Sequence, residues 1–136
     1  MYLAIDYGRK RVGLALGEVQ PRGLGTLDLG QDPVALTAKI AEICRKNDVS
    51  AIILGLPLRS RGEEGTLAPE IRRFAERLSR ATGLPVLFEE EQFTSTEAEG
   101  YLKERGEKFG KEKIDEIAAV LLLEQYLAHR DRESNR

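Results

Sequence analysis

The order of predicted strands and helices indicates an α/β fold. At the start of the chain, two apolar runs, "YLAI" and "VGLAL", stand close to the short polar connection Gly8 to Arg11, which is typical of a β-hairpin. A continuous apolar stretch over residues 50–58, "SAIILGLPL", predicts a central parallel strand that is covered on both faces. Helical patterns follow this strand and the next one. The chain therefore combines a sheet edge built from hairpins with strands joined by parallel crossovers.

The other elements are expected in a regular order along the chain. A short third strand is predicted over residues 23–29, and an amphipathic helix over 32–47, with Asp32 as its cap and Pro33 at its first position. The later predicted elements are a helix over about 67–81 ended by Gly83, a strand within residues 84–90, a helix from the capping-box pair Thr94 and Glu97 to about Arg105, and a last helix over about 114–129. The polar connection 106–113 is expected to be mobile, and the charged tail from about 130 to 136 to fray.

Length and composition limit the class of protein. The 136 residues fit a single domain spanning residues 1–136. The single cysteine, Cys44, excludes an internal disulfide and is expected to be a small core residue of a helix in a protein of a reducing compartment. No apolar run reaches the roughly 18 residues that span a bilayer, and the chain starts without a leader, so we expect a cytoplasmic protein without membrane contact.

The charges nearly cancel. Lys and Arg number 21 and Asp and Glu 23, which argues against a protein that coats nucleic acid through its bulk charge. The basic residues are nevertheless clustered, as in Arg9, Lys10 and Arg11. A nuclease needs cations for phosphates and carboxylates for metal, so a balanced total is compatible with one.

Carboxylates stand at the ends of three predicted elements. Asp6 ends a strand although Asp is a poor strand residue, and an ionised group leaving a buried strand has to be solvated, paired or bound to metal. Asp115 shares a helix side with Ala118, Ala119 and Leu122, so it faces inward. The alternatives are a turn aspartate at Asp6 and a first-turn or N-cap aspartate at Asp115.

The third group of acids is Glu89, Glu90 and Glu91 at the end of a strand. Alternation places Glu89 and Glu91 on one face and Glu90 on the other. Sites of open α/β sheets lie beyond the carboxyl ends of the strands, where one of these acids can meet Asp6. Convergence of three carboxylates, without a His or Cys cluster, would suit Mg²⁺ or Mn²⁺. The single histidine, His129, is expected to have a surface role.

Four motifs resemble the YqgF/RuvX family, which is similar to the RuvC Holliday junction resolvase within the ribonuclease H-like superfamily. They are "AIDYGRKRVGLAL", "IILGLPL", "EEQFTSTEA" and "KIDEIAAVLLLEQYL", and they cover almost the whole chain. The resemblance implies a mixed five-stranded sheet flanked by helices. It also implies metal-binding catalytic acids at Asp6, Glu91 and Asp115, with Glu90 as an alternative for the second.

The resemblance further implies a divalent-metal nuclease that processes the 5′ end of pre-16S rRNA in ribosome biogenesis, with Mg²⁺ or Mn²⁺ as cofactor. Gly8, Arg9, Lys10, Arg11 and Arg59 would grip the nucleic acid, and Gly8 and Gly13 would let the backbone approach it. The implied partners are precursor rRNA or branched DNA and ribosomal precursor particles, with monomer and homodimer both open. This chain departs from the family at Gln92, where an Arg is usual, and in the loop that contains Arg59 and Arg61.

Other functions remain open at this point. The first alternative is a Holliday junction resolvase, which needs two coordinated cuts and so predicts a dimer. The second is a non-catalytic RNA-binding assembly factor whose acids are structural. The Asp-x-Gly hairpin also resembles the phosphate-binding turn of actin-like ATPases and sugar kinases, but these hold nucleotide between two lobes. An esterase or glycosidase could use two acids, although the basic loops fit phosphate better.

Overall fold

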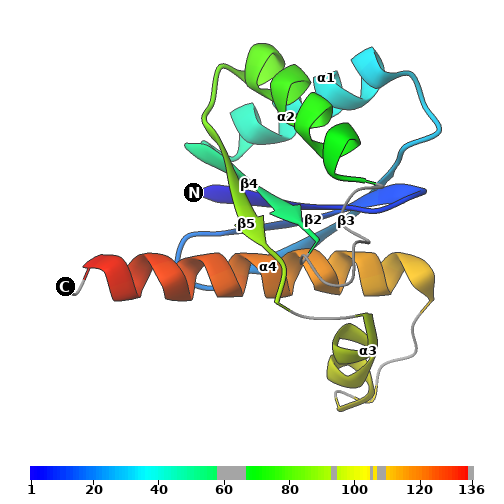
Figure 1. Ribbon diagram of the computed structural model, residues 1–136, viewed down its shortest axis with the longest axis vertical. Coiled ribbons are helices and arrows are strands. Elements are labelled where there is room, and N and C mark those ends of the chain that lie inside the picture. The colour runs from blue at the N-terminus through cyan, green and yellow to red at the C-terminus, as the bar shows by residue number, and fades with distance from the viewer. Residues whose placement is uncertain (58–66, 93–94, 105, 107–109, 135–136) are drawn as a thin grey trace.

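A five-stranded mixed sheet forms the centre of the molecule (Figure 1). The computed structural model describes residues 1–57, 67–92, 95–104, 106 and 110–134. The strands are β1 (Tyr2–Tyr7), β2 (Arg11–Gly17), β3 (Arg22–Asp28), β4 (Ala51–Leu56) and β5 (Val86–Glu90), and they lie in the order β3-β2-β1-β4-β5. The first three pair antiparallel, whereas β1, β4 and β5 run parallel. The predicted hairpin-built edge and parallel crossovers are confirmed.

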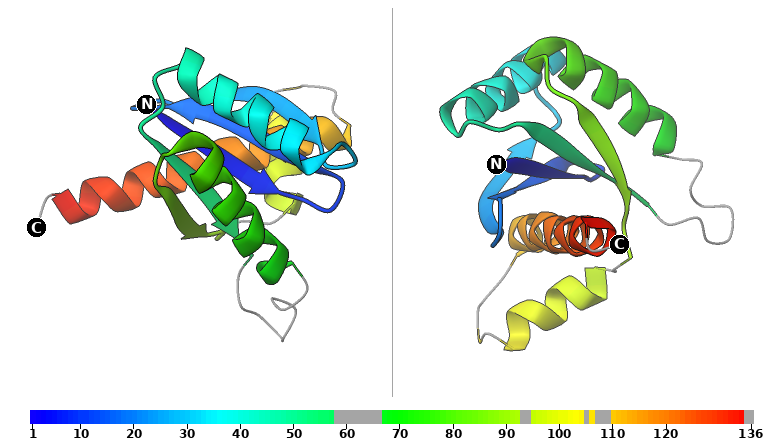
Figure 2. Two further views of the ribbon diagram at one scale, coloured as in Figure 1. Left: turned by 90° about the horizontal axis from the view of Figure 1, so that it is seen from above. Right: turned by 90° about the vertical axis from the view of Figure 1, so that its left-hand side faces the viewer.

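Helices cover both faces of the sheet (Figures 1 and 2). On one face lie α1 (Pro33–Lys46) and α2 (Ala68–Thr82). The long α4 (Lys111–Ser134) crosses the other face, and α3 (Ser95–Glu104) packs on α4 on the side away from the sheet. Asp32 caps α1 by accepting a hydrogen bond from the Val34 amide, and Gly83 ends α2 in the left-handed conformation, both as predicted.

The two faces carry side chains of different size. Leu3, Ile5 and Phe74 belong to the core between the sheet and the α1/α2 layer, where Cys44 is also buried as predicted. The opposite face presents Ala4 and Ala15 to α4. Small side chains on this face let α4 lie close to the strands.

The last helix is longer than the sequence predicted. It begins at Lys111 instead of near Ile114, and it continues to Ser134 instead of ending near His129, so residues 130–134 are helical and not a frayed tail. A contact distant in sequence holds the added C-terminal part: the Arg130 guanidinium lies over the Tyr2 ring, 5.4 Å from its centroid, and donates a hydrogen bond to the Tyr2 hydroxyl. The predicted cap Thr94 and residues 107–109 of the predicted connection 106–113 lie outside the described residues, whereas residues 111–113, expected to be part of this mobile connection, belong to α4. None of the helices in the described part has the length and apolar character needed to cross a membrane.

Candidate functional site

Asp6 points to the face of the sheet that α4 covers. Side chains alternate along β1, and Leu3 and Ile5 belong to the opposite core, whereas Ala4 packs toward α4. Asp6 therefore lies on the α4 face, directly after the stretch of β1 that pairs with β4. Across the hairpin its partner in the register is Gly13.

Glu91 reaches the same place from β5. Its amide donates a 2.8 Å hydrogen bond to the Leu56 carbonyl, which continues the β4–β5 pairing by one step. A β-carbon on Gly55 would lie 2.6 Å from Oε1 of Glu91, so the carboxylate lies directly over this glycine. The predicted alternation holds: Glu89 and Glu91 share the α4 face, and Glu90 is exposed.

Asp115 is brought to the sheet by a close approach of main chains. A β-carbon on Gly13 would lie 1.9 Å from the carbonyl oxygen of Asp115, which excludes any side chain at this position. The expectation that Gly13 serves the approach of nucleic acid is therefore wrong, because the backbone of α4 fills the space over it. Since Gly13 pairs with Asp6, the contact sets the start of α4 beside the end of β1.

The three acids interact electrostatically. Part of Asp6 is accessible to solvent, but burial raises the pKa of its carboxyl group well above the usual range. A hydrogen bond with Glu91 and the negative charges of Glu91 and Asp115 raise this pKa further. The structure thus brings Asp6, Glu91 and Asp115 together at the carboxyl ends of the parallel strands, where the sequence predicted a site.

In this structure the three carboxylates are not arranged around a common metal position. Within the described ranges, no group of three or more His, Cys, Asp or Glu side chains is arranged to hold a metal ion. Oδ2 of Asp115 accepts a 3.0 Å hydrogen bond from Nη1 of Arg11 in a half-buried ion pair. Arg11, which was expected to grip phosphate, therefore neutralises one of the three acids in this state.

The β1–β2 turn carries the other predicted nucleic-acid contacts. The Gly8 amide donates to the Arg11 carbonyl at 2.9 Å, and a β-carbon on Gly8 would lie 2.8 Å from that oxygen, so the tight turn favours glycine. Arg9 and Lys10 are exposed, and with Arg11 they line a pocket of about 550 Å³. The predicted contact Arg59 lies outside the described residues.

Comparison with known proteins identifies the family. The family model described as "RuvX: Holliday junction resolvase" matches residues 1–129. The chain is a member of the RuvX family. The assignment made from the four sequence motifs is thereby confirmed.

Curated RuvX-type relatives agree in sequence over nearly the whole chain. A Chloroflexus aurantiacus protein named "Putative pre-16S rRNA nuclease" is 37% identical over 138 residues, which cover 98% of this chain and 90% of the relative. A Synechococcus elongatus protein of the same name is 37% identical over 131 residues, covering 92% and 87%. Among solved structures, T. thermophilus RuvC in complex with a Holliday junction substrate superimposes with a TM-score of 0.60 over 94% of each chain at 19% identity. The RuvX chain therefore has the predicted RuvC-like, ribonuclease H-like fold.

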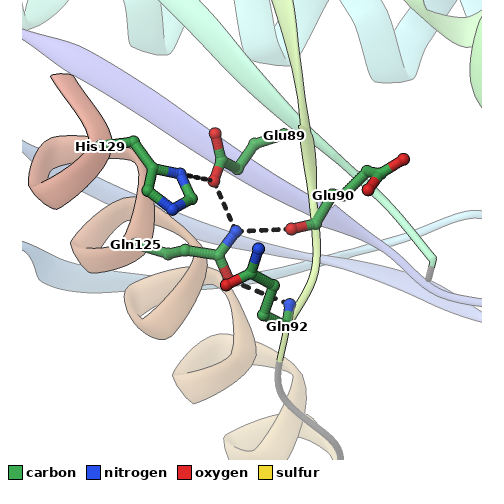
Figure 3. A network of polar contacts seen from close by, with 5 residues as sticks. All are labelled: Glu89, Glu90, Gln92, Gln125 and His129. Carbon is green, nitrogen blue, oxygen red and sulfur yellow. Dashed lines mark hydrogen bonds and ion pairs between the residues drawn. The ribbon is translucent and has the colours of Figure 1, made fainter. Parts of the chain in front are cut away.

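Several contacts that shape this RuvX site were missed in the sequence. Gly55 interrupts an apolar strand, a signal of close approach by another group, and that group is the Glu91 side chain. Glu116 accepts a hydrogen bond from the Gly25 amide, which ties α4 to β3, and it pairs with Lys113 of the same helix at 3.0 Å. Gln125 binds the main chain around Glu91, and His129, predicted at the surface, lies 2.7 Å from Glu89 and is half-buried (Figure 3). No sequence signal marked these last two contacts, because each joins residues more than 30 positions apart.

Proposed function

We propose that this RuvX-family chain is a divalent-metal-dependent nuclease that processes the 5′ end of pre-16S rRNA in the cytoplasm. The observation that carries the proposal is the convergence of Asp6, Glu91 and Asp115, in which burial and then the neighbouring acids raise the pKa of Asp6. The relatives named for pre-16S rRNA supply the substrate, and ribosomal precursor particles are the expected partners.

The donor set fits a hard divalent cation such as Mg²⁺ or Mn²⁺. All three side chains offer carboxylate oxygens, the ligands that these ions prefer. Placing like charges together beneath a helix opposes folding, since burial and the charges of Glu91 and Asp115 raise the cost of ionising Asp6. A bound cation would remove this repulsion, and the ion pair of Asp115 with Arg11 balances part of it in its place. Asp6, Glu91 and Asp115 are therefore the residues that would hold the metal.

The catalytic roles follow from these positions. When bound, a divalent cation supplies a Lewis acid that activates water and stabilises the leaving oxygen of a phosphodiester. Asp6 would hold the cation in its ionised form, which a bound cation would favour against the burial and the neighbouring acids that raise the pKa of this carboxyl group. Asp115 would offer its carboxylate to the cation, and Arg11, which pairs with Asp115 in this structure, would then contact a phosphate of the substrate.

The basic turn beside the acids would bind the nucleic-acid backbone. Arg9 and Lys10 are exposed on the pocket that Arg11 also lines. We assign phosphate contacts to Arg9, Lys10, Arg11 and Arg59, and Gly8 gives the turn its tight shape.

A cleavage assay tests this function. The purified chain is incubated with labelled pre-16S rRNA 5′ ends with Mn²⁺, Mg²⁺ or chelator, beside Asp6→Asn and Asp115→Asn. We expect metal-dependent cleavage at defined positions by the wild type, lost in both variants. Absence of cleavage, with RNA binding unchanged in both variants, would contradict the nuclease and favour a non-catalytic assembly factor.

A second candidate function is Holliday junction resolution. It is favoured by the family description and by the superposition on RuvC bound to a junction. Two coordinated cuts require two copies of the site, so this function predicts a homodimer on a four-way junction. The same assay with a labelled junction distinguishes rRNA processing from junction resolution. Symmetric paired nicks confined to the junction, while the rRNA stays intact, would identify junction resolution as the function.

A further inference from the structure

Gln125, in the middle of α4, bonds to Glu90 and Gln92, the chain neighbours of Glu91 (Figure 3). Its Oε1 accepts a 3.0 Å hydrogen bond from the Gln92 amide, and its Nε2 donates to the Glu90 carbonyl. Nε2 also donates to Oε2 of Glu89. Both amide hydrogens and the amide oxygen are thus used, all on the segment that contains Glu91.

The Gln125 side chain makes the hydrogen bonds that a further β-strand beside β5 would make. β5 is an edge strand, and β4 takes the Glu91 amide on one side. The carbonyl of Glu90 and the amide of Gln92 point to the other side, where a strand would offer one peptide donor and one peptide acceptor. The primary amide of Gln125 supplies both groups from a helix. The peptide units before and after Glu91 are therefore held together, which fixes the direction of its side chain.

The surroundings fix the orientation of the Gln125 amide. Glu89 and Glu90 present acceptors to one end, and Gln92 presents a donor to the other, so only one of the two amide orientations satisfies every group. His129 lies one helical turn further along α4, and its Nδ1 is 2.7 Å from Oε2 of Glu89. Glu89 is thereby held between His129 and Gln125 (Figure 3).

We infer that Gln125 is a positioning residue, whose side-chain amide clamps the main chain at Glu90 and Gln92 so that Glu91 faces Asp6. This inference rests on the proposed function, in which Glu91 is a metal ligand. In this role Gln125 acts through the main chain on both sides of Glu91.

Titration calorimetry with Mn²⁺ alone tests the inference without any turnover. Gln125→Met keeps the length of the side chain and removes all three hydrogen bonds. We expect it to bind Mn²⁺ roughly 10- to 100-fold more weakly than the wild type, the usual effect of losing a group that orients a metal ligand. Gln31→Met is the matched control, since Gln31 also bonds a main-chain carbonyl, that of Asp28, and should leave Mn²⁺ affinity unchanged.

Two further variants separate the possible failures. Leu127→Ala loosens the buried face of α4 and removes none of the Gln125 hydrogen bonds, so it should keep its Mn²⁺ affinity below its melting temperature. If Glu91→Gln loses Mn²⁺ binding while Gln125→Met binds as the wild type does, the clamp is overturned and the metal site stands. If the wild type binds no Mn²⁺, or Glu91→Gln and Asp6→Asn bind it unchanged, the proposed metal site itself fails and the inference falls with it.

Hydrogen exchange of the wild type tests the clamp even if Gln125→Met does not fold. The Gln92 amide should exchange slowly, because it donates to Gln125 although it lies beyond the end of β5. Mn²⁺ should slow its exchange further. Exchange at the rate of an unstructured amide, with and without Mn²⁺, would overturn the inference.

Discussion

Gly13 and Asp115 are in main-chain contact: a β-carbon on Gly13 would lie 1.9 Å from the carbonyl oxygen of Asp115. Both partners of this clash are backbone atoms, so a side chain at residue 13 has to move the start of α4. We expect Gly13→Ala to lower the free energy of unfolding by about 1–3 kcal/mol, the usual cost of overpacking. We also expect roughly 100-fold lower nuclease activity, because Asp115 is displaced from Asp6. Thermal melting and cleavage rates measure the two effects.

Gly100→Ala is the matched control for this substitution. A β-carbon at Gly100, within α3, meets nothing within 4 Å, and alanine is the better helix former by about 0.5–1 kcal/mol. This variant should be at least as stable as the wild type and equally active. Full activity of Gly13→Ala would show that the contact does not position the site.

Neutralising Asp6 should stabilise the metal-free protein. A carboxyl group whose pKa is raised by folding binds more protons in the native state than in the unfolded one, so stability falls as pH rises from the ordinary Asp range through the raised pKa. The full penalty is present above that pKa. We expect Asp6→Asn to melt at a higher temperature than the wild type at neutral pH in chelator and to lack this fall with pH.

Added Mn²⁺ should stabilise only the wild type, so that the wild type then melts at a higher temperature than Asp6→Asn. The exposed Asp48 is the control, because Asp48→Asn should not change the response to Mn²⁺. A metal-free Asp6→Asn protein less stable than the wild type at neutral pH would contradict the electrostatic account of the site.

Arg11 and Arg9 should differ in their effects although both belong to the basic turn. Arg11→Gln leaves Asp115 without its partner beside two other acids, so we expect a loss of about 1 kcal/mol of stability in chelator as well as weaker RNA binding. Arg9→Gln should keep the free energy of unfolding within about 0.5 kcal/mol of the wild-type value. It should also lower the slope of log RNA affinity against log salt concentration by roughly 0.7, the value for one phosphate contact to a single strand.

Filter binding over a salt series and thermal melting distinguish the two variants. Arg45→Gln, an exposed change in the last turn of α1 on the opposite face of the sheet, should alter neither quantity. Equal stability of Arg11→Gln and Arg9→Gln in chelator would mean that the Arg11–Asp115 pair contributes nothing to the metal-free state.

Cys44 should be inert in the folded protein. Burial raises the pKa of its thiol to about 11, so only about a thousandth is thiolate at pH 8, and the side chain is 4% exposed. Iodoacetamide should modify Cys44 only after denaturant unfolds the chain, as mass spectrometry can follow. Rapid modification at pH 8 without denaturant would show that the α1 layer opens readily.

The fold could be predicted because its signals are local. The tight Gly8 turn, the Asp32-Pro33 start of α1 and the apolar run of β4 each specify one element within a few residues. The ends of α4 could not be predicted in this way, since its last turns are held by Tyr2 from the other end of the chain.

The site was predictable in part for the same reason. Asp6 and Asp115 stood out as acids among apolar residues, and the family resemblance selected Glu91 from three adjacent glutamates. The pairing of Arg11 with Asp115 joins residues 104 positions apart, and the clamp by Gln125 is made through main-chain atoms. Neither of these two interactions can be recognised from a pattern of residue types in the sequence.

The most direct test of the account is a crystal structure of the wild-type chain soaked in Mn²⁺, with anomalous diffraction to locate the ion. We predict an anomalous peak roughly 2.0–2.2 Å from carboxylate oxygens of Asp6, Glu91 and Asp115, with Arg11 turned away from Asp115. A peak bound elsewhere, or none under conditions in which the protein cleaves RNA, would contradict the claim that these three carboxylates hold the catalytic metal.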